Sequence, residues 1–159
     1  MDLLISHNKC GLYVLTKRAE KRRFAVLMDE YHPQGYLSRA PMARKRMDIV
    51  YRCGDDWCVL MIVHLINNPY IAQKLRLDWN KTWFIRRIVT IPQSKNKYGD
   101  TASTALKLLC EWLKYHGAEA VLALTLPRHS GAVYKHAGFE YVMDAQTKGM
   151  KWFLRRLRE

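Results

Sequence analysis

The order of elements in the second half of the chain is the feature that most constrains its fold. Trp83 to Ile91 predicts a buried strand, and a Lys/Asn/Gly loop, Ser94 to Asp100, separates it from an amphipathic helix, Thr101 to His116. An apolar run, Glu119 to Leu126, predicts a second strand, and its continuous apolar centre is typical of a parallel strand covered on both faces. Strand, helix and strand in this order predict a right-handed crossover around a parallel pair.

The first half predicts shorter, antiparallel elements. Gly11 to Leu15 reads as a strand, and Lys17 to Tyr31 as a helix that Thr16 caps and His32-Pro33 ends. Asp48 to Cys53 and Trp57 to Ile66 predict a hairpin around a Gly-Asp-Asp turn. Other expected elements are helices over 69–78 and 128–136, a strand over 139–143, and a strand or basic tail over 151–157. The chain is therefore predicted to be α/β, with a mixed, mostly antiparallel sheet and flanking helices.

The length of 159 residues suits one domain with one core. We expect a single domain over 1–159, with a strand, helix and hairpin part over 12–66, a crossover part over 83–143 and a C-terminal segment over 144–159. The sequence contains no repeat or linker that would divide it, and it leaves the oligomeric state open, a homodimer included.

The charge is strongly basic, with 27 Lys+Arg against 14 Asp+Glu and a net charge of +13. Such a balance is typical of nucleic-acid-binding proteins, although a solvated basic surface is the alternative. A Gly/Pro-containing loop, Gln34 to Arg46, carries a dense basic segment. The longest apolar run, Val59 to Ile66, is too short to span a bilayer, and the first residues lack the features of a signal peptide. We expect a cytoplasmic protein with no membrane partner.

The four cysteines show neither a CxxC pair nor zinc-ligand spacing, so no metal site and no disulfide framework is predicted. Cys53 and Cys58 flank the predicted turn and could approach each other, but Cys58 opens an apolar run and is expected in the core. A reducing compartment fits this pattern.

The loop before the central helix predicts an anion site. A strand that leads into a glycine-containing loop at a helix N-terminus directs backbone N–H groups and the positive end of the helix dipole at one point. A phosphate group suits that point, and the helix expected over 128–136 would bring the Tyr134 hydroxyl toward it.

The segment Val133-Tyr134-Lys135-His136-Ala137-Gly138-Phe139-Glu140 closely resembles the one that closes the cofactor site in the GNAT acyltransferase superfamily, and the resemblance runs from Trp83 to Val142. It implies a splayed central parallel pair and an N-acyltransferase that uses acetyl-CoA or another acyl-CoA. It places the pantetheine arm along the backbone of Ile88, Val89 and Ile91. It places the pyrophosphate on the loop that comprises Lys95, Asn96, Lys97, Tyr98, Gly99, Asp100, Thr101 and Ala102.

This loop departs from the family pattern. With Gly99 as anchor, Asn96 and Thr101 stand where the family usually has Gln or Arg and Gly or Ala. Asp100 would either repel a pyrophosphate or cap the following helix, and Lys95 and Lys97 could offset the repulsion.

The resemblance makes Tyr134 the general acid that protonates the departing thiolate, whereas an amphipathic core tyrosine is the alternative. The family's strand glutamate is missing, since no Glu lies between Ser38 and Cys110. His32 and His64 are then the candidate bases, and His64 is equally well explained as a structural histidine. An acceptor amine that arrives unprotonated would need no strong base.

A narrower resemblance concerns the Tyr31-His32 pair, Lys95-Asn96 and the segment from Arg128 to Tyr134, which look like Mom-type phage enzymes that modify adenine in DNA. It implies acyl transfer to an amine on nucleic acid, either a DNA base or a tRNA-linked amine. Candidate substrate contacts are Tyr31, Tyr36, Arg39, Arg44, Lys45, Arg46 and Arg87. The alternatives are a protein or small-molecule N-acetyltransferase and a non-catalytic basic GNAT-fold module that binds nucleic acid.

Overall fold

The computed structural model describes residues 1–37 and 44–158, so the candidate contact Arg39 lies outside the described residues. Eight strands form one sheet in the order β1-β2-β3-β4-β5-β6-β8-β7. The strands are β1 (Asp2–His7), β2 (Cys10–Val14), β3 (Arg44–Cys53), β4 (Asp56–Leu65), β5 (Thr82–Thr90), β6 (Ala120–Leu124), β7 (Glu140–Asp144) and β8 (Lys151–Arg156). The helices are α1 (Arg18–Tyr31), α2 (Pro69–Lys74), the short 3₁₀ helix η1 (Pro92–Ser94), α3 (Lys95–Tyr98), α4 (Ala102–Tyr115) and α5 (Ala132–His136).

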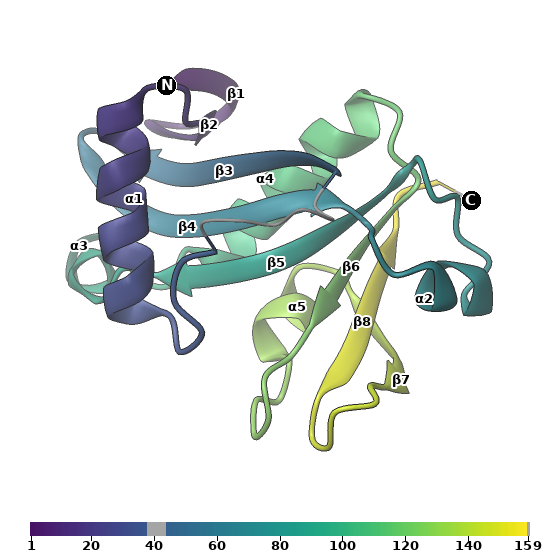
Figure 1. The fold of residues 1–159 in the computed structure, drawn as a ribbon. Helices are drawn as coiled ribbons and strands as arrows, with labels where there is room; N and C mark the ends of the chain where they lie inside the picture. Colours follow the sequence, from purple (N-terminus) through teal and green to yellow (C-terminus); the bar gives the residue numbers. More distant parts are fainter. Residues whose placement is uncertain (38–43, 159) are drawn as a thin grey trace.

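The sheet is mixed, as predicted, because β5 and β6 are parallel while the other neighbouring strands are antiparallel. The parallel pairing starts at Thr82 opposite Ala120 and ends at Ile85 opposite Ala123. On its other edge β5 stays paired with β4 as far as Thr90. β5 and β6 therefore separate beyond Ile85, as Figure 1 shows, and the predicted splayed pair is confirmed.

A β-bulge lies at the point of separation. Ile62 of β4 pairs with Arg87, and the next residue, Val63, pairs with Ile85. Arg86 is thus the extra residue of β5, and such a residue bends its strand and increases the local twist. The bulge places two consecutive arginines where β5 leaves β6.

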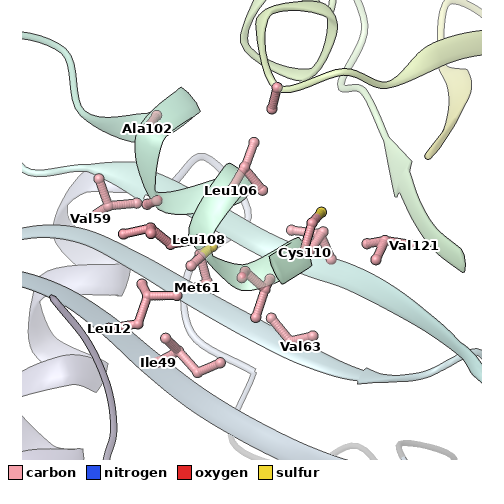
Figure 2. Close-up of a cluster of buried hydrophobic side chains, with 14 of the residues drawn as sticks. Leu12, Ile49, Val59, Met61, Val63, Ala102, Leu106, Leu108, Cys110 and Val121 are labelled. Carbon is pink, nitrogen blue, oxygen red and sulfur yellow. The ribbon is translucent and has the colours of Figure 1, made fainter. Parts of the chain in front are cut away.

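Helix α4 covers one face of the sheet (Figure 1). Its apolar stripe, which includes Leu106, Leu109 and Leu113, packs in one buried cluster with Leu12 and Met61 from the strands. Figure 2 shows this cluster beneath the helix. Burying a leucine side chain contributes about 1.5–3 kcal/mol, so this stripe fixes the position of α4 on the sheet.

Helix α1 covers the opposite face and buries far less of itself. Only Phe24 and Met28 among its residues are fully buried, where they meet Val50 and Leu60. Its basic residues Lys21, Arg22 and Arg23 and their neighbours Lys17 and Arg18 are exposed. The predicted division of this helix into a packing face and a cationic face is therefore observed.

Four local features differ from the prediction. Strand β1 was not expected, because its apolar run is short and has polar residues at both ends; it pairs with β2. Arg44, Lys45 and Arg46 belong to β3 rather than to a loop, and α3 lies inside the predicted loop. The N-cap of α1 is Lys17 rather than Thr16, and Glu20 Oε1 accepts the Lys17 N–H at 3.1 Å.

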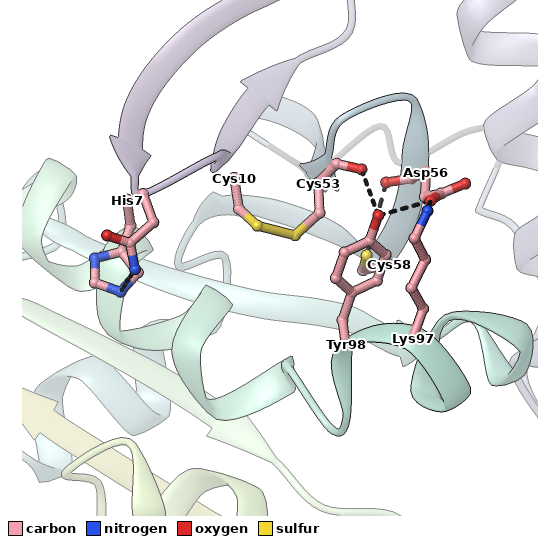
Figure 3. Close-up of a disulfide and its surroundings, with 8 residues drawn as sticks. His7, Cys10, Cys53, Asp56, Cys58, Lys97 and Tyr98 are labelled. Atoms are coloured by element: carbon pink, nitrogen blue, oxygen red, sulfur yellow. Dashed lines mark hydrogen bonds and ion pairs between the residues drawn. A yellow bond between two sulfur atoms is a disulfide. The ribbon is translucent and has the colours of Figure 1, made fainter.

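The prediction of unpaired cysteines was also wrong, because Cys10 and Cys53 form a disulfide (Figure 3). These residues face each other across β2 and β3, and side chains opposite one another in an antiparallel pair are close enough to bond. The sequence alone did not show that these two strands are neighbours. Cys58 is a buried free thiol, in agreement with its expected place in the core.

No helix in the described ranges is long and apolar enough to cross a membrane.

Candidate active site between the splayed strands

A cavity of about 980 Å³ opens where β5 and β6 separate. Its walls are residues 86–90 of β5, residues 124–126 after β6, residues 128–134 leading into α5, and residues 31–34 after α1. Ligand pockets in proteins range from roughly 300 to 1,000 Å³, so this space suits a large ligand.

The edge of β5 supplies the floor of the cavity. Beyond Ile85 the described residues show no pairing between β5 and β6, which leaves one row of β5 backbone groups facing the cavity. The predicted contacts Ile88 and Val89 line it. Ile91 does not, because its side chain packs in the α1 cluster and its N–H donates to the Cys58 carbonyl at 2.8 Å.

The predicted anion loop contributes only part of its residues. Lys95, Asp100 and Ala102 line the cavity, whereas Asn96 and Gly99 are exposed elsewhere and Thr101 is buried. The Asp100 carboxylate accepts the Ala102 N–H at 3.2 Å, so an acidic side chain stands at the N-terminus of α4. This carboxylate uses one of the backbone donors that a phosphate would otherwise reach.

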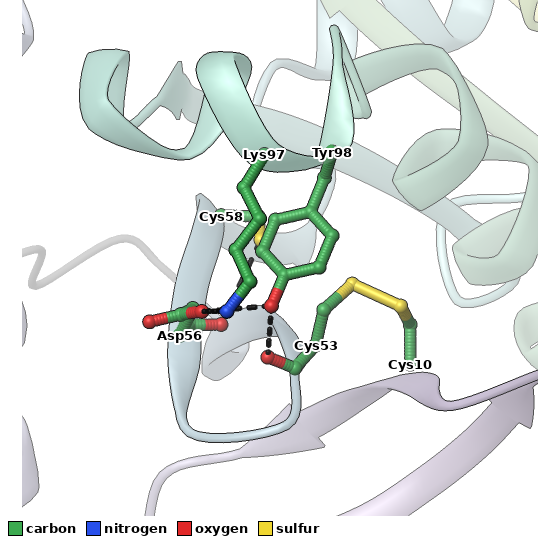
Figure 4. Close-up of polar contacts among 6 residues, drawn as sticks. All are labelled: Cys10, Cys53, Asp56, Cys58, Lys97 and Tyr98. Atoms are coloured by element: carbon green, nitrogen blue, oxygen red, sulfur yellow. Dashed lines mark hydrogen bonds and ion pairs between the residues drawn. A yellow bond between two sulfur atoms is a disulfide. The ribbon is translucent and has the colours of Figure 1, made fainter.

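Lys97 and Tyr98 anchor the loop instead of facing the cavity. Tyr98 Oη donates to Asp56 Oδ2 at 2.7 Å and lies 3.2 Å from the Cys53 carbonyl, and Lys97 Nζ lies 3.1 Å from the same carboxylate oxygen (Figure 4). The hydrogen bonds from Tyr98 and Lys97 lower the pKa of Asp56. These contacts hold α3 against the turn between β3 and β4.

Tyr134 lies at the opposite wall, on α5. Its ring is buried against Phe139 and Phe153, with centroid separations of 5.7 and 5.9 Å, and the residue also lines the cavity. Burial raises the pKa of the phenol, which is therefore protonated at neutral pH. Gly131, at the N-cap of α5 with φ +78°, touches the Phe153 ring so closely that a Cβ would collide with it, so this turn requires glycine.

His32 also lines the cavity, and its hydrogen bond fixes its tautomer. The Gln34 N–H donates to Nδ1 at 3.1 Å, so the proton of the neutral ring resides on Nε2. Burial, together with the nearby Arg87 charge, lowers the pKa of His32 to about 4. At neutral pH His32 is thus a neutral hydrogen-bond donor at Nε2, which does not suit the predicted role of base.

His64 is not part of the cavity wall. It is fully buried on β4, its Nδ1 donates to the Leu65 carbonyl at 2.7 Å, and its ring packs edge-on against Phe84. Burial lowers the pKa of His64, so the ring is neutral. These surroundings fit a structural histidine, which was the alternative to the predicted role of His64 as a base.

The predicted substrate contacts separate into two groups. Tyr31 and Arg87 line the cavity. Arg46 instead pairs with Asp48 at 2.9 Å and lies over the Tyr36 ring at 5.2 Å. Arg44 donates to the Ile66 and Trp79 carbonyls at 2.8 and 2.7 Å, and Lys45 is exposed on β3. The guanidinium groups of Arg44 and Arg46 therefore hold the fold together, while Arg87 faces ligand space.

The wall of the cavity carries more positive charge than the predicted site residues alone would give it. Arg86, Arg87, Lys95 and Arg128 line it, and Asp100 is the only acidic residue in its described wall. Arg86 was not among the candidates, because an alternating strand pattern puts consecutive residues on opposite faces and gives no sign of a bulge.

Solved structures with similar folds place the chain in a structural class. It matches the ribosomal-protein-S18-alanine N-acetyltransferase from Escherichia coli with a TM-score of 0.69 and 10% identity, covering 94% of this chain and 95% of that one. It matches aminoglycoside acetyltransferase AAC(6')-Ib in complex with coenzyme A and kanamycin with a TM-score of 0.63 and 13% identity, covering 92% and 94%. The GNAT domain of S. lividans PAT gives 0.62 and 14%, covering 92% and 90%. The chain has the GNAT fold.

A sequence relative then identifies the family. "Uncharacterized protein 154" of Sulfolobus islandicus rod-shaped virus 1 is 32% identical over 129 residues, which cover 77% of this chain and 80% of that protein. The chain belongs to the same family as this viral protein. No protein-family model matches the chain.

Proposed function

We propose that the protein is an acyl-CoA-dependent N-acyltransferase whose acceptor is an amine on a nucleic acid. The observation that carries this proposal is the cationic cavity between β5 and β6, with an unpaired strand edge on one side and the Tyr134 phenol on the other. The GNAT fold and the coenzyme A bound in similar structures support the cofactor part.

The residues of the cavity fit an acyl-CoA. The free backbone groups at Ile88 and Val89 can pair with an amide-containing arm, and Lys95 supplies a positive charge near the N-terminus of α4. The Asp100 carboxylate would repel a pyrophosphate at this place. Its side chain is exposed, so it can turn away from the helix when a pyrophosphate binds. When bound, acyl-CoA supplies a thioester as the activated acyl group.

Tyr134 and His32 would perform different tasks in the transfer. The buried, protonated phenol of Tyr134 is suited to give a proton to a thiolate leaving group. The Nε2–H of His32 is suited to donate a hydrogen bond to a polar group of the acceptor. The proton that the attacking amine loses would pass to the imidazole of His129, which also lines the cavity, or to water.

The acceptor is restricted because the described wall holds no glutamate that could serve as base, and besides His32 the only imidazole there is that of His129. Asp100 is the only carboxylate in the described wall, and it accepts the Ala102 N–H at the start of α4. At neutral pH a lysine amine, with a pKa near 10.4, arrives almost entirely protonated, an α-amino group, with a pKa near 8, arrives partly unprotonated, and the exocyclic amine of a base arrives unprotonated. The cationic wall also repels polyamines and basic peptides. An amine on a phosphate-rich molecule meets both conditions.

The exposed face of α1 supports the same substrate. Lys17, Arg18, Lys21 and Arg22 form a cationic surface on this helix. Such groups neutralise backbone phosphates and position a nucleic acid without reading its sequence.

The test is to incubate the protein with acetyl-CoA and separately with DNA, tRNA and a lysine-containing peptide, and to analyse each by mass spectrometry. We expect acetyl adducts on nucleic acid and fewer with the Tyr134→Phe variant. Adducts on the peptide alone would contradict the nucleic-acid acceptor and favour a protein acetyltransferase.

The position of Asp100 favours a second candidate, a GNAT-fold module that binds nucleic acid without catalysis. The carboxylate already occupies a donor at the N-terminus of α4, where a cofactor phosphate would bind. Salt-dependent binding to DNA or RNA, together with no adduct in the assay above and no heat on titration with acetyl-CoA, would select this candidate.

A further inference from the structure

We propose that Arg86 and Arg87 form a phosphate-binding pair that holds a backbone phosphate of the acceptor beside the transfer site. This inference rests on the proposed function, because it specifies how that acceptor is held. The pair sits at the bulge where β5 leaves β6, and both residues line the cavity.

Arg86 and Arg87 lack a counter-ion among the residues that the structure describes. Both residues are partly buried, and neither takes part in any ion pair of the described residues. Arg87 donates from Nε to the Gly35 carbonyl at 3.2 Å and from one terminal nitrogen to the Arg86 carbonyl at 3.0 Å. Burying charge without a partner is unfavourable, so an anionic ligand would stabilise this arrangement.

The guanidinium of Arg87 is held in place by two hydrogen bonds. Its two hydrogen bonds to carbonyls orient the planar group, and the second terminal nitrogen forms no hydrogen bond with the described residues. That nitrogen and the guanidinium of Arg86, which presents its donors as a planar fork, can donate to oxygens of one phosphate. The nearby His32 adds a neutral donor, Nε2–H, to the same part of the wall.

The position of Arg86 and Arg87 on β5 separates this pair from the expected place of the cofactor pyrophosphate. The N-terminus of α4, where a cofactor pyrophosphate would lie, follows the far end of β5. Strands rise about 3.3 Å per residue, so Arg87 and Thr90 lie roughly 10 Å apart along β5. An anion bound at the bulge would therefore belong to the acceptor and not to the pyrophosphate of acyl-CoA.

The experiment compares the binding of deoxyadenosine 5'-monophosphate and deoxyadenosine by calorimetry, with coenzyme A saturating. We expect the wild-type protein to bind the nucleotide about tenfold more tightly than the nucleoside, since a hydrogen-bonded charged group contributes roughly this much. The Arg86→Gln/Arg87→Gln variant should lose that preference. The Arg86→Lys/Arg87→Lys variant, which retains charge without the fork, should retain only part of it.

The matched control is Lys107→Gln/Lys114→Gln, which removes two exposed charges from α4 outside the cavity wall. It should leave the nucleotide preference unchanged, and equal thermal midpoints should show that all variants fold. Equal binding of nucleotide and nucleoside by the wild-type protein would overturn the proposal, and so would a preference that survives in the Gln variant. A tenfold loss of coenzyme A affinity in the Gln variant would assign the pair to the cofactor and would also overturn it.

Failure of the proposed function is distinguishable from failure of this inference. If coenzyme A does not bind and no adduct forms, the transferase proposal fails, while the phosphate preference and its dependence on the arginines are still measured directly.

Discussion

The two ends of the cavity are built in different ways. At the α4 end, around Thr90, Asp100 and Ala102, the wall is backbone that α4 and the anchored α3 helix hold in place. At the bulge end, around Arg86 and Arg87, the wall consists of charged side chains that have no acidic partner among the described residues. The fold thus determines where an acyl donor would lie, while side chains on a bulge would select the acceptor.

Tyr134→Phe should have the largest effect, because the role proposed for this residue lies in the transfer step itself. General acid catalysis contributes about 10²–10⁴-fold, and we expect kcat to fall by roughly that factor. The KM values for both substrates should change little. Steady-state kinetics measure this, and a melting midpoint close to that of the wild-type protein shows that the aromatic packing is retained. Unchanged kcat would remove Tyr134 from the mechanism.

Removing the disulfide should weaken the α4 end. Cys10→Ser/Cys53→Ser releases a link between β2 and β3, and the Cys53 carbonyl beside it is a contact of Tyr98. A disulfide typically contributes about 2–4 kcal/mol to the free energy of unfolding. Urea denaturation should show a loss of this size.

The control for that experiment is a reducing agent. Dithiothreitol should destabilise the wild-type protein and leave the double variant unchanged. If wild-type stability does not respond to reduction, the bond does not contribute as described.

Acid should act on the bulge end through His32. Its pKa in the folded protein is about 4, below the ordinary 6.5, so between these values the unfolded chain binds more protons. Stability from this residue is complete above pH 6.5 and is lost as pH falls toward 4, by up to about 3 kcal/mol.

The matched variant is His32→Asn, whose side-chain oxygen can still accept the Gln34 N–H without titrating. The free energy of unfolding, measured by urea denaturation at several values between pH 4 and 7, should change less with pH for this variant than for the wild-type protein. Parallel slopes for the two proteins would contradict the assignment of a buried, neutral His32.

Tyr98→Phe should have the smallest effect and should concern only the α4 end. It removes hydrogen bonds to Asp56 and Cys53, so the loop is held less firmly and the KM for acyl-CoA should rise about three- to tenfold. Lys97→Ala removes only an exposed ion pair and is the control, with an expected change below twofold. An equal effect of the two variants on the KM for acyl-CoA would show that the hydrogen bonds of Tyr98 do not hold the loop more firmly than the Lys97 ion pair does.

Much of the fold could be predicted from the sequence because periodicity and turn residues are local signals. The apolar stripe that includes Leu108, Leu109 and Leu113 predicted α4, and the apolar run from Trp83 to Ile91 predicted β5. The disulfide could not be predicted, since it depends on which strands are neighbours. The bulge at Arg86 also has no local signal.

The candidate site was predictable where backbone forms it and less so where side chains do. Ile88, Val89, Ala102 and Tyr134 line the cavity as expected from the family resemblance. Lys97 and Tyr98 do not line the cavity, although the resemblance placed them there. Asp56, which is distant in the sequence, holds both side chains on the opposite side of the loop.

The most direct test is a titration of isotopically labelled protein with acetyl-CoA, followed by the backbone amide signals in nuclear magnetic resonance spectra. The account predicts that the largest shifts occur at residues 88–90 of β5 and at Ala102 and Ser103 of α4, with smaller ones at α1. Saturating acetyl-CoA that leaves the β5 signals unmoved, or that moves only the signals of α1, would contradict it.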